Sequence, residues 1–574
     1  MYLRTVTART KDGPVQYLQL AHNFRNPTTG QSQPRILYNF GRLDQVDRAA
    51  LERLAHSIRR FLEPADAAGL RSALQEQGLS FCATRSLGGA WLLDRLWHRL
   101  GLDRALTRHG LDAELERAVF TLVANRALAP SSKLSVTDWS AEEAWIPGWQ
   151  PPALPEPDDE EARLAERKRR ANVLYRAMDA LAEGLDAVQT QVFRAISGGS
   201  FLDLDVDLLY FDTTTTYWEI EDEDEGDGEG RPGLRCRGHT KDDRADAPQV
   251  VIGLAVTRAG IPIRCWVWPG NTADVTVIGQ VKRDLVGWRL GRVITVVDRG
   301  FVSEENLRVL QEQGGHYIAG ERMRSGKAAV REALGRAGRY RQVRQGLEVK
   351  EVLVGEGEAR RRYVVVRNPA EAERDRRRRE AVLAELAERL RELEGLTGDR
   401  RLRREAELLA EEGYRRYLRR TASGVLAIDR DQVAAEARLD GKYLLRTSDD
   451  TLSAEDVALG YRQLQAVERA FRTLKTTLDL RPVYHRLADR IRAHVLLCWL
   501  ALLLVRVAEE KTGLSWPVLR REFERMAVVV FQGPGGGGAQ RTVTTGAQRR
   551  VLQALGLEEP PMVFALSPKG SRAP

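Results

Sequence analysis

Cysteine is scarce in this chain, and no long hydrophobic run is present. Its four cysteines lie far apart along 574 residues and form no CxxC pair, which excludes a disulfide framework and a cysteine-type zinc site. A reducing compartment is the simpler assumption. The N-terminal stretch MYLRTVTARTKDG lacks the apolar core of a signal peptide. The longest apolar run, residues 495–505, has 11 residues, whereas a membrane-spanning helix needs about 20. We therefore expect a buried helix there, no membrane association and a cytoplasmic location.

An acidic excess is also absent. The chain has 89 Lys and Arg against 81 Asp and Glu, a formal charge of +8, which suggests a polyanionic partner. The excess is uneven: residues 1–62 hold 10 basic and 4 acidic side chains, and residues 461–494 hold 8 and 3. Residues 371–420 are nearly balanced, with 15 Arg and 13 acids, which is typical of a solvated helical hairpin with i,i+4 ion pairs.

The length predicts about three or four domains at roughly 100–200 residues each. Alternation and turn residues predict three short strands in the first 40 residues, then a helix over 47–61. This basic meander either contacts DNA or merely packs on the next domain. The remaining patterns indicate mixed α/β structure. We predict these segments: 1–65, meander and helix; 66–200, helical; 201–300 and 453–527, mixed sheet with helices; 301–452, β-rich with the charged hairpin; 528–574, a flexible tail.

Three acids stand out by their sequence context. Asp212 and Asp298 follow the apolar strands LLYF and ITVV, and Glu468 lies in the helical stretch YRQLQAVERAFRTLK. Two acids at the ends of strands in one sheet would lie close together, and a divalent cation such as Mg²⁺ or Mn²⁺ would relieve their repulsion. Two such ions can act on both oxygens of a phosphodiester exchange. The alternative for each aspartate is a solvated or capping carboxylate.

The helix around Glu468 has a cationic side. Tyr461, Glu468, Arg472 and Lys475 recur at helical spacing, beside an apolar stripe that would dock the helix. A carboxylate with cations beside it suits metal chemistry on a phosphate backbone. The alternative is an ordinary i,i+4 ion pair between Glu468 and Arg472 on an exposed face.

With these residues in view, the chain resembles bacterial insertion-sequence transposases of the DDE type. The matching blocks are YFDTTTTYWE, RGHTKDDRADAPQVVIGLAV, WPGNTADV, VITVVDRGF and YRQLQAVERAFRTLKTTLDLRPVYH, with RIRAHVLLCWLALLL after them. They span roughly residues 200–510. The combination is specific, although no single block is.

The resemblance implies an RNase H-like α/β catalytic domain with flanking helices, interrupted by a β-rich insertion of 170 residues between Asp298 and Glu468. By position, Asp212, Asp298 and Glu468 correspond to the catalytic and metal-binding acids of the family, and Mg²⁺ or Mn²⁺, as two ions, is the implied cofactor. Lys241 falls in the block before the second strand and is an expected DNA contact.

The family signature around the glutamate is Tyr, two residues, Arg, three residues, Glu, six residues, Lys. Tyr461, Glu468 and Lys475 fit it, whereas Leu464 stands in the place of the Arg. Arg462 or Arg469 is a substitute for that phosphate contact. A tryptophan that stacks on a flipped base is also missing, since residues 299–467 contain no Trp. The expected DNA-binding residues are therefore Tyr461, Arg462, Arg469, Arg472, Lys475 and Lys241.

The function implied is DNA transposition. The chain would bind terminal inverted repeats of double-stranded DNA as a homodimer in a synaptic complex, cleave the strands, and transfer the 3′-OH ends to target DNA. It would then be bacterial and associated with the nucleoid. Two alternatives are an RNase H-like metal-dependent nuclease without strand transfer, and a non-enzymatic DNA-binding remnant of a mobile element.

Overall fold

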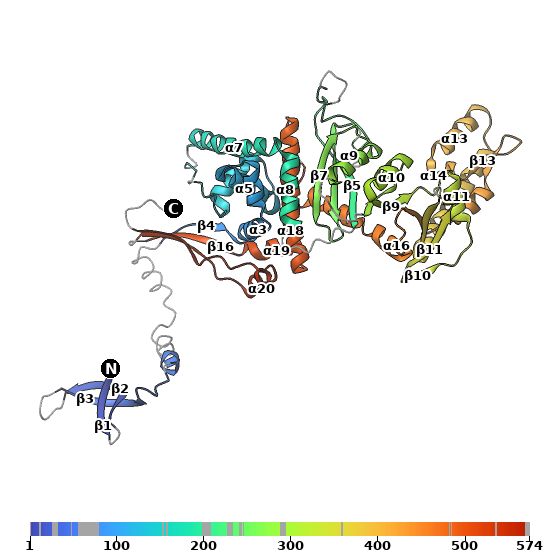
Figure 1. Cartoon of the computed structure of the whole chain (residues 1–574). Coiled ribbons are helices and arrows are strands. Elements are labelled where there is room, and N and C mark those ends of the chain that lie inside the picture. Colours follow the sequence, from blue (N-terminus) through green and yellow to red (C-terminus); the bar gives the residue numbers. More distant parts are fainter. Residues whose placement is uncertain are drawn as a thin grey trace. The chain divides into compact units, whose positions relative to one another are not determined.

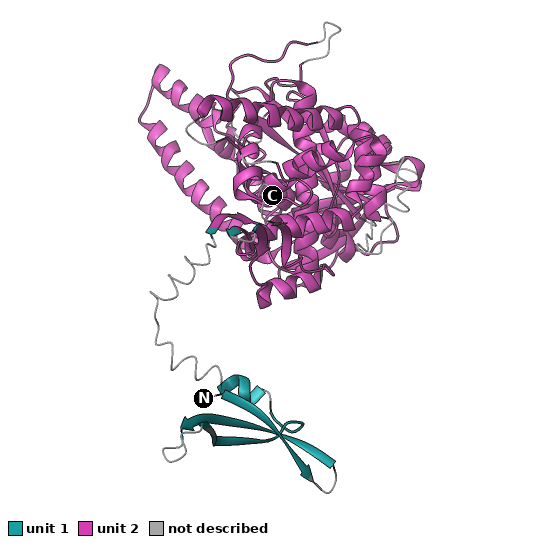
Figure 2. Ribbon diagram, turned by 90° about the vertical axis from the view of Figure 1, so that its left-hand side faces the viewer, with its two compact units in different colours: residues 1–80, 532–536 teal, residues 81–531, 537–574 magenta. Residues whose placement is uncertain are grey.

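A computed structural model of the chain divides into two compact units (Figures 1 and 2). One contains Met1–Ser80 with Gln532–Gly536, and the other contains Phe81–Phe531 and Gly537–Pro574. The structure describes residues 2–10, 13–25, 32–47, 49–54, 80–151, 154–155, 159–197, 208–226, 233–239, 244, 246–286, 294–357, 360–481, 483, 485–533 and 536–568.

The N-terminal segment is the antiparallel three-stranded sheet β1-β2-β3. Its strands are β1 (Tyr2–Thr10), β2 (Gly13–Arg25) and β3 (Ser32–Arg42). The predicted meander is therefore confirmed. Of the predicted helix over 47–61, residues 49–54 are helical and residues 55–61 lie outside the described part.

Helices dominate residues 88–197, as the periodicity predicts. The side chains of Asp112, Ser132 and Asp159 cap three of them by accepting a backbone N–H. The short strand β4 (Ser80–Ser86) precedes them and was not predicted. The helices are α3 (Gly88–Arg99), α4 (Leu102–His109), α5 (Ala113–Leu128), α6 (Lys133–Asp138), the π-helical turn Trp139–Glu143, α7 (Glu160–Ala182) and α8 (Leu185–Ser197).

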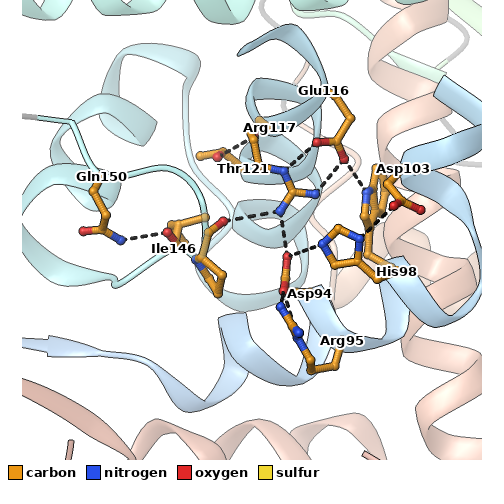
Figure 3. A network of polar contacts seen from close by, with 11 residues as sticks. Asp94, Arg95, His98, Asp103, Glu116, Arg117, Thr121, Ile146 and Gln150 are labelled. Atoms are coloured by element: carbon orange, nitrogen blue, oxygen red, sulfur yellow. Dashed lines mark hydrogen bonds and ion pairs between the residues drawn. The ribbon is translucent and has the colours of Figure 1, made fainter. Parts of the chain in front are cut away.

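A buried ionic network joins α3, α4 and α5 (Figure 3). Asp94, whose side chain is 1% exposed, lies at its centre and accepts from Arg117 at 2.7 Å and from Arg95 at 2.6 Å. His98 lies between Asp94, at 3.4 Å, and Asp103, at 2.9 Å. Arg117 also binds Glu116. A buried charge is costly unless it is paired, so this network depends on all of its members.

The central sheet has nine strands in the order β10-β11-β12-β15-β9-β8-β5-β6-β7. Parallel pairing is confined to β5, β8 and β9, and the other pairs are antiparallel. The strands are β5 (Leu208–Tyr217), β6 (Gln249–Thr257), β7 (Pro262–Pro269), β8 (Ile294–Val297), β9 (His316–Glu321), β10 (Arg341–Arg344), β11 (Leu347–Val354), β12 (Arg361–Arg367) and β15 (Lys442–Thr447).

Helices cover both faces of this sheet, which explains why inner strands such as β6 and β8 are buried along their whole length. One face packs against α9 (Asp274–Val286) and α10 (Glu304–Gln311) through residues such as Phe211. The other face, with Tyr210, packs against α16 (Ala454–Arg462), α17 (Gln465–Thr476) and α18 (Ala488–Thr512).

Helix α18 contains the longest apolar run. Among the described helices it alone is long and apolar enough to cross a membrane, yet 89% of its most apolar window is buried inside the protein. It packs against α5, α7, α17 and β7. The expectation of a buried core helix is therefore confirmed.

The β-rich stretch predicted over 301–452 continues the central sheet, because β9 to β12 and β15 all belong to it. The charged hairpin is confirmed as α12 (Pro369–Glu394) and α13 (Gly398–Ala410), with i,i+3 and i,i+4 ion pairs such as Arg376 with Glu373. The remaining elements here are α11 (Ala328–Gly335), α14 (Glu412–Arg415), α15 (Arg430–Ala437) and the small sheet β13 (Leu418–Arg420) with β14 (Leu426–Ile428).

The prediction of a flexible tail over 528–574 is wrong. The sheet β18-β17-β16-β4 combines β4 with the end of the chain. Branched side chains in AVVVF favour a strand, and the glycines that follow continue the pairing. The elements are α19 (Trp516–Glu524), β16 (Ala527–Gly533), β17 (Gly536–Arg541), α20 (Gly546–Ala554) and β18 (Val563–Pro568).

Candidate active site

Two of the predicted acids are neighbours across the sheet. Strands β5 and β8 are parallel, and their register pairs Leu208 with Ile294 and Phe211 with Val297. Asp212 and Asp298 are the next residues on each strand, and neighbouring strands lie about 4.8 Å apart. Asp298 comes directly after β8, as predicted. The prediction that Asp212 ends its strand is wrong, because the β-branched threonines after it extend β5 to Tyr217.

Asp212 and Asp298 lie level with each other on adjacent strands, and the third parallel strand has a glycine at the same level, so that the three positions form a row across the sheet. Strand β9 pairs Ala319 with Val297, so Gly320 is the neighbour of Asp298. Because side chains alternate along a strand, all three positions share the face of Tyr210, which is covered by α16, α17 and α18.

Tyr461 of α16 fills the space that Gly320 leaves. Its hydroxyl donates a 2.7 Å hydrogen bond to Oδ1 of Asp298. A Cβ atom at position 320 would lie 2.3 Å from the hydroxyl oxygen of Tyr461 and 3.0 Å from Cζ. Burial, and then the adjacent Asp298 carboxylate, raise the pKa of Tyr461, so the hydroxyl keeps its proton. The glycine thus allows a neutral donor to orient a carboxylate.

A fourth acid lies near the row and was not predicted as a site residue. Asp274, the first residue of α9, accepts a hydrogen bond from the hydroxyl of Thr213, which follows Asp212. A Cβ atom at Gly300 would lie 3.4 Å from Oδ2 of Asp274. Asp274 belongs to the WPGNTADV block, which is one of the blocks that carry the family resemblance.

Glu468 is exposed on α17, and the structure does not bring it into a cluster with the two aspartates. Within the described ranges, no three Asp, Glu, His or Cys side chains lie close enough together to hold a metal ion. The single helix expected over 461–475 is interrupted between α16 and α17, at Gln463 and Leu464. This break separates Tyr461, which reaches Asp298, from the helix that carries Glu468.

The predicted apolar stripe of α17 is confirmed, since its members are all buried and pack in one core: Leu464, Val467, Phe471, Leu474 and Leu478. The helix packs against β5, the strand of Asp212, and against β6. Of the predicted DNA contacts, Arg462, Arg469 and Arg472 are exposed, and Lys475 is half-buried. Lys241 lies outside the described residues.

A groove of about 1020 Å³ opens beside Asp298 at the carboxyl ends of β8 and β9. Its walls include Asp298, Gly320, Tyr461, Tyr443 and the basic residue Arg299. Ligand sites of α/β sheets gather at this edge of parallel strands. Asp298 therefore has an open approach for a large substrate.

Two histidines and two tryptophans in or near the matching blocks are buried and pack against other rings in the protein interior. His485 is buried between Tyr175 and His494, and burial lowers its pKa to about 3. The rings of Trp266 and Trp268 stack with their centroids 6.0 Å apart within the core.

Comparison with protein families supplies the identity. Residues 3–69 match the model of the IS1634 family transposase N-terminal domain, and residues 237–504 match the transposase DDE domain. The chain is a DDE transposase of the IS1634 family. The DDE match includes Asp298 and Glu468 and begins after Asp212. The transposase is therefore an enzyme of the class that transposes DNA.

Two further comparisons add little about this transposase. No curated protein matches. Among solved structures, the piggyBac transposase in a synaptic complex with hairpin DNA is similar at 11% identity and a TM-score of 0.35, over 72% of this chain and 71% of that one. At that TM-score the likeness is too weak to carry a structural conclusion.

Proposed function

We propose that the transposase cleaves DNA at the ends of its insertion sequence and joins the freed 3′-OH ends to target DNA, with Asp212, Asp298 and Glu468 as its catalytic acids. The observation that carries this proposal is the pairing register of β5 and β8, which makes Asp212 the neighbour of Asp298, and Asp298 lines a groove.

The donor set fits a divalent metal ion. Two carboxylates on adjacent strands repel each other, and hard oxygen ligands suit Mg²⁺ or Mn²⁺. Asp212 and Asp298 would hold the metal. Glu468 would become the third ligand when α17 brings it to the pair, since the structure leaves it outside their cluster. When bound, two such ions would supply Lewis-acid stabilisation of the attacking and leaving oxygens. The Tyr461 hydroxyl orients Asp298 through Oδ1.

The proposed reaction has two phosphoryl transfers. Water attacks the phosphodiester at the end of the insertion sequence, the bond from phosphorus to the 3′-oxygen breaks, and a 3′-OH remains. That 3′-OH then attacks a target phosphodiester, forms a new phosphorus–oxygen bond and releases a target 3′-OH. The exposed Arg462, Arg469 and Arg472 and the half-buried Lys475 would hold the DNA backbone near Glu468.

Recognition of the DNA ends is assigned to the N-terminal meander. Residues 1–62 carry ten basic and four acidic side chains, and the IS1634 N-terminal match covers this segment. Because a transposition event joins two ends, we propose that two copies of the chain act together on the terminal inverted repeats.

The test replaces each acid with its amide: Asp212→Asn, Asp298→Asn and Glu468→Gln. With Mg²⁺ and a linear DNA that carries the ends of the insertion sequence, each variant should lose strand cleavage and joined products by about 100-fold or more, and band-shift assays should find end binding unchanged. Asp399→Asn and Glu388→Gln, on the exposed hairpin, are matched controls that should stay active. Retained cleavage by a variant would remove that residue from the site, and cleavage without joined products would favour the nuclease.

A further inference from the structure

The groove at Asp298 continues into a second groove. The second, of about 870 Å³, lies among α11, α14 and α15, and Met323, Arg324 and Glu412 line both. Together they lead from the carboxyl end of β8, past the segment after β9, into the stretch between β9 and α16. The proposed role of Asp212 and Asp298 in cleavage does not by itself explain this second groove.

The combined groove is strongly basic. Nine Lys or Arg side chains and four Asp or Glu side chains line its two parts, and one of the acids is Asp298 itself. Two of the other acids are already neutralised. Glu436 forms a bidentate pair with Arg324, with a shortest distance of 2.7 Å, and Glu321 binds Lys327 at 2.9 Å. Positive charge therefore dominates what remains.

Several of the remaining cations are available for a ligand. Arg322, Arg331 and Arg438 are exposed, and within the described part of the chain no carboxylate lies within ion-pair distance of them. Three exposed arginines along one groove give it a positive potential that attracts an anion. Arginine forms strong bidentate hydrogen bonds with phosphate groups, so a phosphate backbone matches this wall.

The shape of the groove selects the form of the nucleic acid. Each part is about the size of a large small-molecule site, which suits a narrow strand rather than a double helix. Half-buried Tyr443 and Tyr461 and the side chain of Met323 contribute apolar and aromatic wall near Asp298. A basic groove with aromatic faces is the usual architecture for binding single strands.

We propose that the groove running from Asp298 past Arg322 to Arg331 and Arg438 binds a single-stranded segment of DNA next to the phosphodiester being cut. This inference rests on the proposed function for its catalytic context. It also gives α11, α14 and α15 a role, which is to lengthen the DNA path beyond the acidic row.

The experiment measures binding of the full-length protein in EDTA, so that cleavage does not enter. The probes are a fluorescein-labelled 20-nucleotide single strand of mixed sequence and its duplex. The variant R322A/R331A/R438A is compared with R378A/R400A/R403A, which removes the same charge from the exposed hairpin of α12 and α13. Equal net charge makes long-range attraction equal, so a difference between the variants isolates the groove.

For the single strand, the groove variant should bind about tenfold or more weakly than the control, with the slope of log affinity against log salt reduced by about 2, since each lost phosphate contact lowers it by about 0.7. Duplex binding should change equally in both variants. Circular dichroism and thermal melting should be the same for both, because the altered residues are exposed.

Two results would overturn the inference: equal single-strand affinity in the two variants, or equal losses on single strand and duplex in the groove variant. Failure of the proposed function is a separate outcome, since it appears as cleavage retained by the acid variants. A photo-crosslinker in place of Met323 supplies a second readout, and it should label the single strand in preference to the duplex.

Discussion

A methyl group added at Gly320 should disable the active site without touching an acid. The Cβ atom of Gly320→Ala would lie 2.3 Å from the hydroxyl oxygen of Tyr461 and 3.0 Å from Cζ. Real contacts are longer, so the tyrosine ring has to move. Its hydrogen bond to Asp298 is then lost, and the carboxylate loses the group that orients it.

The size of the effect follows from that hydrogen bond. A hydrogen bond to a charged group contributes about 1.5–3 kcal/mol, and each 1.4 kcal/mol is about tenfold in rate. Tyr461→Phe, which removes only the hydroxyl, should therefore slow DNA cleavage by about tenfold to 100-fold. Gly320→Ala also displaces the ring, and a misplacement of about 1 Å can cost about 100-fold.

The double variant G320A/Y461F tests whether the clash with the Tyr461 hydroxyl causes the loss of activity. G320A/Y461F lacks the oxygen that is closest to the new methyl group, so most of the clash disappears. Its cleavage rate should fall within about threefold of that of Tyr461→Phe alone, which is far from additive. The assay is single-turnover cleavage of labelled DNA that carries the ends of the insertion sequence.

Gly395→Ala is the matched control, because position 395 lies at the end of α12, where the nearest atom is a backbone oxygen 3.8 Å away. It should cleave at the parent rate. If Gly320→Ala also cleaves at the parent rate, or if the two single effects multiply in the double variant, Tyr461 does not position Asp298.

Two further predictions concern the network of Figure 3. Arg117→Ala should destabilise α3 to α5 by about 3 kcal/mol, because it leaves the buried Asp94 short of a partner, whereas Arg95→Ala, whose side chain is 37% exposed, should cost less than about 1 kcal/mol. Hydrogen exchange of these helices measures both, and equal effects would contradict the burial argument. Hydrogen bonds to Asp103 and then Asp94 raise the pKa of His98 from 6.5 to about 9. Its stabilisation should be complete below about pH 6.5 and lost as the pH rises through about 9, and His98→Gln should remove that part of the pH dependence in thermal melts.

Local patterns in the sequence predicted much of this molecule. The meander, the apolar stripe of α17 and the buried α18 follow from periodicity, which depends only on near neighbours. The closeness of Asp212 and Asp298 was also predicted, but for Asp212 the reason was incomplete, because it lies within β5 and the parallel register with β8 makes it the neighbour of Asp298. The threonines after Asp212 favour a longer strand, and β5 does extend to Tyr217.

Contacts between residues far apart in the chain could not be predicted from local sequence patterns. The hydrogen bond from Tyr461 to Asp298 joins residues 163 positions apart, and the space for it depends on a glycine in a third strand. A glycine in an apolar strand carries no signal about what fills the space beside it. Likewise, the glycines of residues 536–538 resemble a tether in sequence, while in the structure they belong to β17, which pairs with β16 and β18.

The position of β9 in the sheet has a consequence for how the chain folds. Its antiparallel partner is β15, and the register pairs Gly320 with Leu445, 125 residues later in the chain. At about 5–20 residues per second, synthesis takes roughly 6–25 s to cover that interval. Until then β9 has an open edge on one side, and Tyr461 has not left the ribosome to meet Asp298. The nascent transposase therefore stays without its active-site architecture until its C-terminal third is made, and that open edge is where misfolding or aggregation would begin.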